Sequence, residues 1–256
     1  MNITKEEYRQ KYTENDLVGW DCINNSLKNI YDISKARHYA SIIKYSFGGP
    51  DPLDGVSIFD NSEFTFHRHM VSYGMSELYF EPECAGKEYS KWGFEFTFRL
   101  KVVEEDSEYN NSPHEPIWAI NVMQNFARYV FDTSKYFDTY HFIPCNSSIR
   151  VNTETKIVGI AFIPDPQLEK IDTPHGEVTF LQMVGLTEEE LQWLWIDPTR
   201  TRCKKLIDLM QKDNPLLITD LSRQHSYIPT DDIQEVKKEE KKSNVSILSK
   251  IKNFFS

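Results

Sequence analysis

The sequence predicts an α+β fold in which helices cover a mixed, largely antiparallel sheet. Strand patterns and helix patterns follow one another irregularly along the 256 residues, without the regular strand–helix alternation of a parallel sheet. Hydrophobic residues make up 39% of the chain and aromatic residues 13%, which is enough for a packed core. No segment repeats at a fixed period, so the pattern does not indicate a solenoid or a propeller.

The first 31 residues predict two helices. Thr4 and Glu7 match a capping box, in which each side chain accepts a hydrogen bond from the other residue's backbone amide. We therefore expect a short helix within residues 1–15. Residues 16–31 show one apolar stripe at spacings of three and four, typical of a helix packed on a core. The stripe consists of Trp20, Ile23, Leu27 and Ile30.

Strand patterns follow at residues 40–46, 56–60, 64–80 and 93–103. The last is the clearest, because apolar and polar residues alternate along it. One side would carry Phe94, Phe96, Phe98, Leu100 and Val102. The other would carry Glu95, Thr97, Arg99 and Lys101. This alternation is typical of an antiparallel strand with one face on the core and one polar face.

The second half of the chain continues the mixture of elements. Thr187 and Glu190 match a second capping box and should begin a helix. Other helices are predicted over residues 117–131 and 200–212, and strands over residues 155–163, 177–184 and 216–221.

The composition changes after about residue 226. Residues 227–256 are rich in charge and poor in apolar side chains until a short amphipathic stretch at the end. We expect a charged linker and a short C-terminal helix there. Residues 16–226 would then form the main domain.

Net charge and apolar content indicate which kinds of partner and which location to expect for this protein. The formal net charge is −10, and no basic stripe interleaved with aromatics precedes residue 235, so no nucleic-acid partner is expected. No stretch approaches the roughly twenty apolar residues of a membrane span. The N-terminus lacks the apolar region of a secretory signal, so a cytoplasmic location is expected. An acidic protein is better suited to a basic protein partner. The oligomeric state stays open.

The four cysteines, Cys22, Cys84, Cys145 and Cys203, lie about sixty residues apart. This spacing matches neither a compact zinc site nor a disulfide framework. We expect free thiols in a reducing compartment.

Residues 47–59, FGGPDPLDGVSIF, combine glycines, prolines and aspartates directly before an apolar run. A phosphate-binding loop needs consecutive backbone amides, which Pro50 and Pro52 cannot supply. Asp51, Asp54 and Asp60 do not match the ligand spacing of a calcium loop. A stiff turn that presents a surface is the prediction that remains.

His67-Arg68-His69 is the sharpest candidate for a metal site. Two histidines two residues apart on a strand share a face and could bind one ion. Zinc would need a third ligand, for which Glu77, His38 or His114 are candidates. Hydrogen-bonded histidines on a half-buried strand are the simpler interpretation. No nucleophile motif occurs, so neither an enzyme nor a cofactor is expected.

Six segments resemble the Suppressor of fused family, within a match that runs in order from Gly19 to about Arg223. They are FGGPDPLDGVS, FHRHMVSYGMSELYF, KWGFEFTFRLK, WAINVMQNFARYVF, DTPHGEVTFLQMVGLTEEEL and PLLITDLSR. The sequence departs from the family pattern at FHRH, where Arg68 replaces an aromatic residue. It also covers only the first family domain, so a two-domain clamp is not expected within one chain.

The resemblance implies a mixed α/β fold, no catalysis and a protein partner. The animal member restrains a Gli-type transcription factor by clamping a peptide strand, and bacterial relatives are often proposed to be immunity proteins. Tyr79 matches a tyrosine of the family's peptide-contacting region. Our candidate contact residues are Tyr79, Glu77, Trp92, Asp51 and Asp54.

Three hypotheses follow. The first is a bacterial immunity protein that binds and neutralises a cognate polymorphic toxin, whose domain would be basic. The second is a regulatory or scaffold module that binds a peptide strand of a partner. The third, less favoured, is a metal-dependent enzyme that uses His67 and His69.

Overall fold

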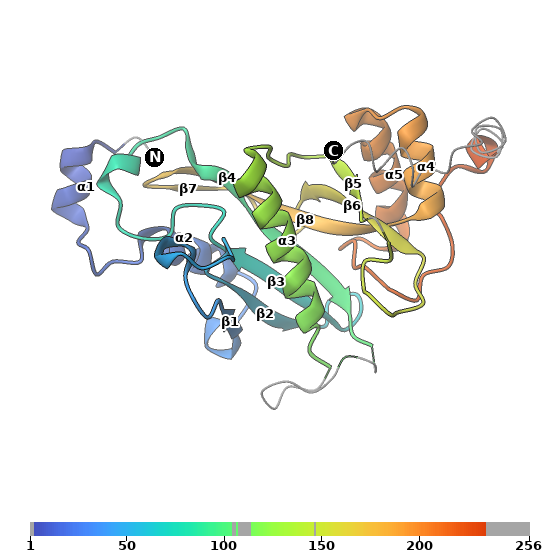
Figure 1. The fold of residues 1–256 in the computed structure, drawn as a ribbon, viewed down its shortest axis with the longest axis horizontal. Helices are drawn as coiled ribbons and strands as arrows, with labels where there is room; N and C mark the ends of the chain where they lie inside the picture. Colours follow the sequence, from blue (N-terminus) through green and yellow to red (C-terminus); the bar gives the residue numbers. More distant parts are fainter. Residues whose placement is uncertain (1–2, 104–105, 107–113, 146, 234–256) are drawn as a thin grey trace. The chain divides into compact units, whose positions relative to one another are not determined.

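The computed structural model describes residues 3–103, 106, 114–145 and 147–233 (Figure 1). These residues form two compact units. The N-unit comprises the described residues up to Phe137 together with Pro164–Gln182. The C-unit comprises Asp138–Ile163 and the described residues from Met183 onward. The predicted boundaries at residues 15 and 226 stay predictions.

The helices and strands of the N-unit come from both of its chain segments. Its helices are α1 (Lys5–Lys11), α2 (Val18–Leu27) and α3 (Ile117–Thr133), with short 3-10 turns η1 (Ile33–Lys35), η2 (Tyr45–Phe47) and η3 (Pro82–Cys84). Its strands are β1 (Arg37–Ala40), β2 (Gly55–Asn61), β3 (His67–Tyr73), β4 (Tyr89–Lys101) and β7 (Ile171–Thr173).

The C-unit contains β5 (Phe142–Pro144), most of β6 (Ile157–Pro164), α4 (Glu188–Ile196), α5 (Arg200–Asp213) and η4 (Thr230–Asp232). Strand β8 (Gly176–Thr187) contributes residues to both units. The strand order is β1-β2-β3-β4-β8-β6-β5, and β7 pairs with β8. The pairs β1–β2, β2–β3, β3–β4, β5–β6 and β7–β8 are antiparallel. The predicted α+β class is confirmed.

Both predicted capping boxes are present. In α1, Thr4 Oγ1 accepts from Glu7 N at 3.2 Å, and Glu7 Oε2 accepts from Thr4 N at 2.8 Å. In α4, Thr187 and Glu190 make the same reciprocal pair at 3.3 and 2.7 Å. Each box satisfies two amides that a helix start leaves without an intrahelical partner.

Helices cover both faces of the N-unit sheet. Helix α3 packs across β4, where the ring of Phe98 lies 6.5 Å from that of Trp118 (Figure 1). On the opposite face, Ile23 and Leu27 of α2 share a core with Phe59, Val71 and Tyr73, among others. The predicted alternation along β4 is therefore confirmed, but its polar face is also buried. Glu95, Thr97 and Arg99 are all fully buried.

Two predicted strands differ from the structure. The strand expected over residues 40–46 lies at Arg37–Ala40, and the chain then turns into an exposed loop. The strand expected over residues 216–221 is wrong, although this segment is largely buried. Leu217 has a φ of 51°, which interrupts an extended backbone, and the Asn214 side chain pairs with both backbone groups of Ile218.

No helix in the part of the chain that the structure describes is long and apolar enough to cross a bilayer. All four cysteines are free, as their spacing predicted. The predicted C-terminal helix lies outside the described residues.

Candidate partner-binding surface

The loop between β1 and β2, residues 41–54, is fastened at its base. Ser41 N donates to Asp54 O at 2.8 Å, which closes the loop. The buried Gln124 of α3 then binds Leu53 on both sides: it accepts from Leu53 N at 3.1 Å and donates to Leu53 O at 3.0 Å. Gln124 also donates to Ser41 Oγ at 3.1 Å. The loop therefore has a fixed base on α3.

Two glycines fold the loop back on itself. Gly48 has a φ of 84°, a conformation that other residues adopt at a cost. A Cβ atom on Gly49 would lie 2.0 Å from Ile43 O, so only glycine fits there. These contacts agree with the predicted stiff turn that presents a surface.

The loop presents apolar side chains to solvent. Ile42 is 102% exposed, Phe47 81%, Ile43 54% and Tyr45 43%. Single exposed apolar residues are common, but four within six residues on a fastened loop are not explained by core packing. Apolar side chains grouped in this way are typical of protein contact sites.

Tyr79, a predicted contact residue, lies against Asp54, another predicted contact residue and the last residue of this loop. Tyr79 Oη donates a hydrogen bond to Asp54, and Lys44 Nζ donates one to Tyr79 Oη. Lys44 Nζ lies 3.2 Å from the Asp54 carboxylate and 4.3 Å from the centre of the Tyr79 ring. Burial, together with the hydrogen bond to Asp54, raises the pKa of Tyr79 above its usual value.

Helix α3 contacts Trp92 and two residues of the loop, Tyr45 and Asp51. The ring of Phe131 lies 5.6 Å from that of Trp92 and 5.1 Å from that of Tyr45. Arg128 Nε donates to Asp51 Oδ1 at 3.1 Å. We call this set the 41–54 surface. It consists of Ile42, Ile43, Lys44, Tyr45, Phe47, Asp51, Asp54, Tyr79, Trp92, Arg128 and Phe131.

Glu77 has a different environment. Its backbone carbonyl lies 3.2 Å from His175 Nδ1, and its amide donates to Ser90 Oγ at 2.9 Å. A partner contact by its side chain stays a prediction.

The sequence analysis did not identify Ile42, Phe47 and Phe131 as residues of this surface. The signal was the apolar Ile42-Ile43 pair, which precedes the Gly48-Gly49 turn by four intervening residues.

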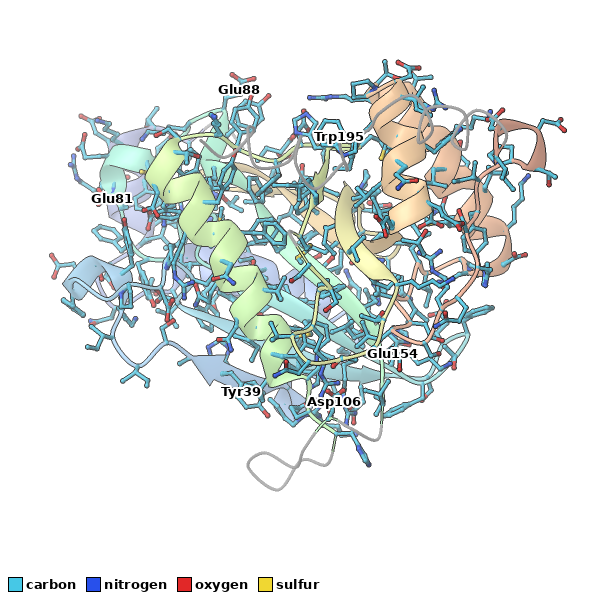
Figure 2. All side chains as sticks on the ribbon, turned by 45° about the vertical axis from the view of Figure 1, so that its right-hand side comes forward. Tyr39, Glu81, Glu88, Asp106, Glu154 and Trp195 are labelled. Atoms are coloured by element: carbon cyan, nitrogen blue, oxygen red, sulfur yellow. The ribbon has the colours of Figure 1, made fainter. Side chains whose placement is uncertain are left out.

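At the other end of α3, Tyr39 and Asp106 lie near the helix N-terminus (Figure 2). Tyr39 Oη donates to Glu115 Oε2 at 2.8 Å, and Trp118 Nε1 donates to Asp106 Oδ1 at 3.1 Å. Arg37 Nε donates to Glu115 Oε2 at 2.6 Å, so the buried Glu115 carboxylate has a cationic partner. These contacts hold α3 on the sheet and thereby hold Gln124 under the loop.

The two candidate metal-binding histidines are hydrogen-bonded within the N-unit. His69 Nδ1 lies 2.8 Å from Tyr31 Oη, and His69 Nε2 lies 3.1 Å from Asp165 Oδ2. His67 Nδ1 lies 2.7 Å from Thr65 O, and its Nε2 lies 3.4 Å from Arg99. All four ring nitrogens therefore have protein partners.

The charges in this buried network follow from its contacts. Burial, reinforced by the positive charge of Arg99, lowers the pKa of His69 to about 4. Burial acts to raise the pKa of Asp165, but His69 and Arg99 outweigh it and hold that pKa far below its usual value. A neutral His69 beside an Arg99–Asp165 ion pair of 2.8 Å is the consistent arrangement. The described residues contain no group of three or more His, Cys, Asp or Glu side chains placed to hold a metal ion.

The sequence and the fold of this chain are similar to those of known proteins of one family. The family model for Suppressor of fused protein matches residues 49–224. The human Suppressor of fused homolog is 34% identical over 231 residues, which are 83% of this chain and 45% of that protein. The chain thus spans less than half the length of this curated relative.

Two crystal structures show a similar fold. The structure of a Sufu–Fu complex has a TM-score of 0.73 at 30% identity and covers 86% of this chain and 96% of the matched one. The Drosophila Suppressor of Fused structure has a TM-score of 0.74 at 28% identity and covers 90% of this chain and 56% of that one. The chain belongs to the Suppressor of fused family.

Proposed function

We propose that this protein is a non-catalytic binding module whose 41–54 surface holds a segment of a partner polypeptide. The observation that carries the proposal is the group of exposed apolar side chains on a loop fastened to α3. A similar chain has been crystallised in a Sufu–Fu complex, which supports a protein as the class of partner. We do not propose Fu itself as the partner, because the chain spans only 45% of the human relative.

The surface combines the residue types that dominate binding energy. Tyr, Trp and Arg are enriched among interface residues whose truncation costs about 2 kcal/mol or more. Tyr79, Trp92 and Arg128 are of these types, and the apolar loop lies beside them. Because the loop is held in place before binding, little ordering entropy would be lost on association.

The net charge supports the more specific proposal of an immunity protein acting in the cytoplasm. An acidic protein attracts a basic toxin domain over long range and speeds encounter. Four free cysteines are in keeping with a reducing compartment. A regulatory or scaffold module that binds a peptide strand is the second candidate, favoured by the apolar loop rather than by the charge.

Affinity capture with loop variants tests the binding surface. The double variant Ile42→Asp/Phe47→Asp should lose partners that the wild type retains, because two carboxylates would replace the apolar anchors. Val151→Asp is the matched control, since Val151 is 76% exposed in the C-unit. Equal recovery of every partner by both variants would contradict the proposal.

Co-expression separates the two candidates. An immunity protein should restore growth to cells that express the toxin encoded beside it, and Ile42→Asp/Phe47→Asp should abolish this protection. Partner binding through the loop without any protection would favour the regulatory module.

A further inference from the structure

Strand β1 is the outermost strand at one end of the sheet order and, among the strands that the structure describes, pairs only with β2 (Figure 1). The antiparallel register runs from Arg37↔Ile58 to Ala40↔Gly55 without a bulge. Ser41 N donates to Asp54 O, so the backbone of residue 41 faces β2. Backbone groups alternate in direction along an antiparallel strand, so those of Tyr39 also face β2. Those of His38 and Ala40 face outward.

The outward groups form an open edge within the described part of the chain. His38 and Ala40 are exposed, and no described residue pairs with their outward amides and carbonyls. Edge strands are usually protected by proline, lysine or a bulge, and β1 has none of these. Arg37, the charged residue of β1, does not protect the edge either, because its side chain pairs with Glu115 at 2.6 Å and with Asp60 at 2.7 Å.

We infer that an extended segment of the partner adds to the sheet as a strand along β1. It pairs with the outward backbone groups of His38 and Ala40 and lays apolar side chains on Ile42 and Ile43. This inference rests on the proposed function and specifies how the partner is bound. The outward amide and carbonyl groups of His38 and Ala40 lie two residues apart along the strand. This spacing matches the backbone of another extended chain, so a polypeptide strand is the ligand that fits the edge.

The surroundings define the side chains of that segment. Ile42 and Ile43 directly follow the edge and are 102% and 54% exposed, so they favour apolar residues in the ligand. The net charge of −10 disfavours acidic residues and also a second copy of this chain. Two outward residues offer up to four hydrogen bonds, so the apolar contacts must supply much of the affinity. The occupant is therefore an extended, apolar, non-acidic segment of another protein.

Amide hydrogen exchange by NMR tests the edge directly. The probe is a set of twelve-residue peptides selected on the wild-type protein from a random phage-displayed library. In the free protein, the amides of His38 and Ala40 should exchange much faster than that of Tyr39, which already bonds β2. Saturating peptide should slow exchange at His38 and Ala40 by about tenfold or more and leave Tyr39 unchanged.

A proline variant tests the same pairing by affinity. Ala40→Pro removes the outward amide without removing a bond to β2, a position where edge strands tolerate proline. It should weaken peptide binding by roughly fivefold or more, since one backbone hydrogen bond is lost. Ala40→Val keeps the amide and is the matched control, with binding near that of the wild type. The exchange experiment needs no variant and stays decisive if Ala40→Pro does not fold.

The outcomes separate this inference from the proposed function. Peptides that require Ile42 and Phe47 but leave the His38 and Ala40 amides unprotected would overturn strand addition and keep the 41–54 surface. Protection that rises with protein concentration in the absence of peptide would assign the edge to a second copy and overturn the inference. A library without any enriched peptide would also count against it, whereas the proposed function is tested independently by the co-expression experiment.

Discussion

Gln124 binds Leu53 through both of that residue's backbone groups, with hydrogen bonds of 3.1 and 3.0 Å. Leu53 lies fully buried at the end of the loop, and Gln124 is 5% exposed on α3. A side-chain amide has a donor and an acceptor, so it can replace a neighbouring strand for one residue. This pair fixes where the 41–54 loop leaves the sheet.

Gln124→Ala should destabilise the protein and loosen the loop. The variant leaves the buried amide of Leu53 without a partner, which costs about 1–3 kcal/mol, whereas Leu53 O keeps its hydrogen bond from Ser41 Oγ at 2.6 Å. Urea unfolding should show a loss of free energy of that order. Asn121→Ala, at an exposed position of the same helix, is the control and should change stability little. Equal stability of the two variants would show that the loop does not depend on Gln124.

Asp165→Asn should be among the most destabilising single changes in the N-unit. Asp165 accepts hydrogen bonds from Arg99 at 2.8 Å and from Thr97 at 2.7 Å, and all three residues are buried. Removing one partner of a buried ion pair costs about 3–5 kcal/mol, because the other charge stays buried. The free energy of unfolding measures this loss.

The matched control for Asp165 is an exposed ion pair. Asp208 lies 2.7 Å from Lys204 one turn away on α5, and both side chains are 51% exposed. Asp208→Asn should cost about 0.5 kcal/mol or less. A similar loss in both variants would mean that water reaches the Arg99–Asp165 pair.

His69→Gln should reduce the dependence of stability on pH. The pKa of His69 is lowered from 6.5 to about 4 in the folded protein, mainly by burial. Between these values the unfolded chain binds a proton that the native protein does not, so acidification destabilises the fold. The stability that His69 contributes is complete above pH 6.5 and falls as the pH drops toward about 4.

The measurement is the free energy of unfolding at a series of pH values. The difference between wild type and His69→Gln should change with pH across this window and be constant above it. His225→Gln, at an exposed position, should follow the wild-type curve. Parallel curves for wild type and His69→Gln would show that His69 takes up its proton in the folded state.

Local sequence signals predicted the elements that depend on local chemistry. The alternation along Phe94, Phe96 and Phe98 identified β4, and the two capping boxes gave the starts of α1 and α4 within a residue. The strand expected over residues 40–46 was misplaced because Ile42 and Ile43 have the side chains of a strand. Their exposure follows from the turn at Gly49 and from Gln124, more than seventy residues further along the chain.

The buried polar face could not be predicted for a related reason. Arg99 and Glu95 are charged residues of the kind usually found on a solvent-exposed face. Their burial depends on partners that are distant in the sequence. Arg99 finds Asp165 66 residues away, and Glu95 accepts from Ser72 and Ser76, 23 and 19 residues away. Of the predicted contact residues, Tyr79 was suggested by resemblance alone, and its bond to Asp54 became evident only in three dimensions.

Two substitutions at Tyr79 separate the ring from the hydroxyl in partner binding. Tyr79→Phe keeps the ring under Lys44 and removes the hydrogen bond to Asp54. Asp54 keeps its contact with Lys44 Nζ at 3.2 Å, so affinity for the captured partner should fall about fivefold or less. Tyr79→Ala removes the aromatic anchor as well and should weaken binding by roughly thirtyfold, the equivalent of about 2 kcal/mol.

Calorimetric titration of each variant with the same partner gives these affinities, and circular dichroism confirms that the fold is kept. Tyr136→Ala is the control for loss of an exposed ring, since Tyr136 is 61% exposed in the N-unit and lies outside the 41–54 surface. Its affinity should equal that of the wild type. If Tyr79→Ala behaves like Tyr136→Ala, the Tyr79 ring does not contribute to partner binding and is not an anchor of the 41–54 surface.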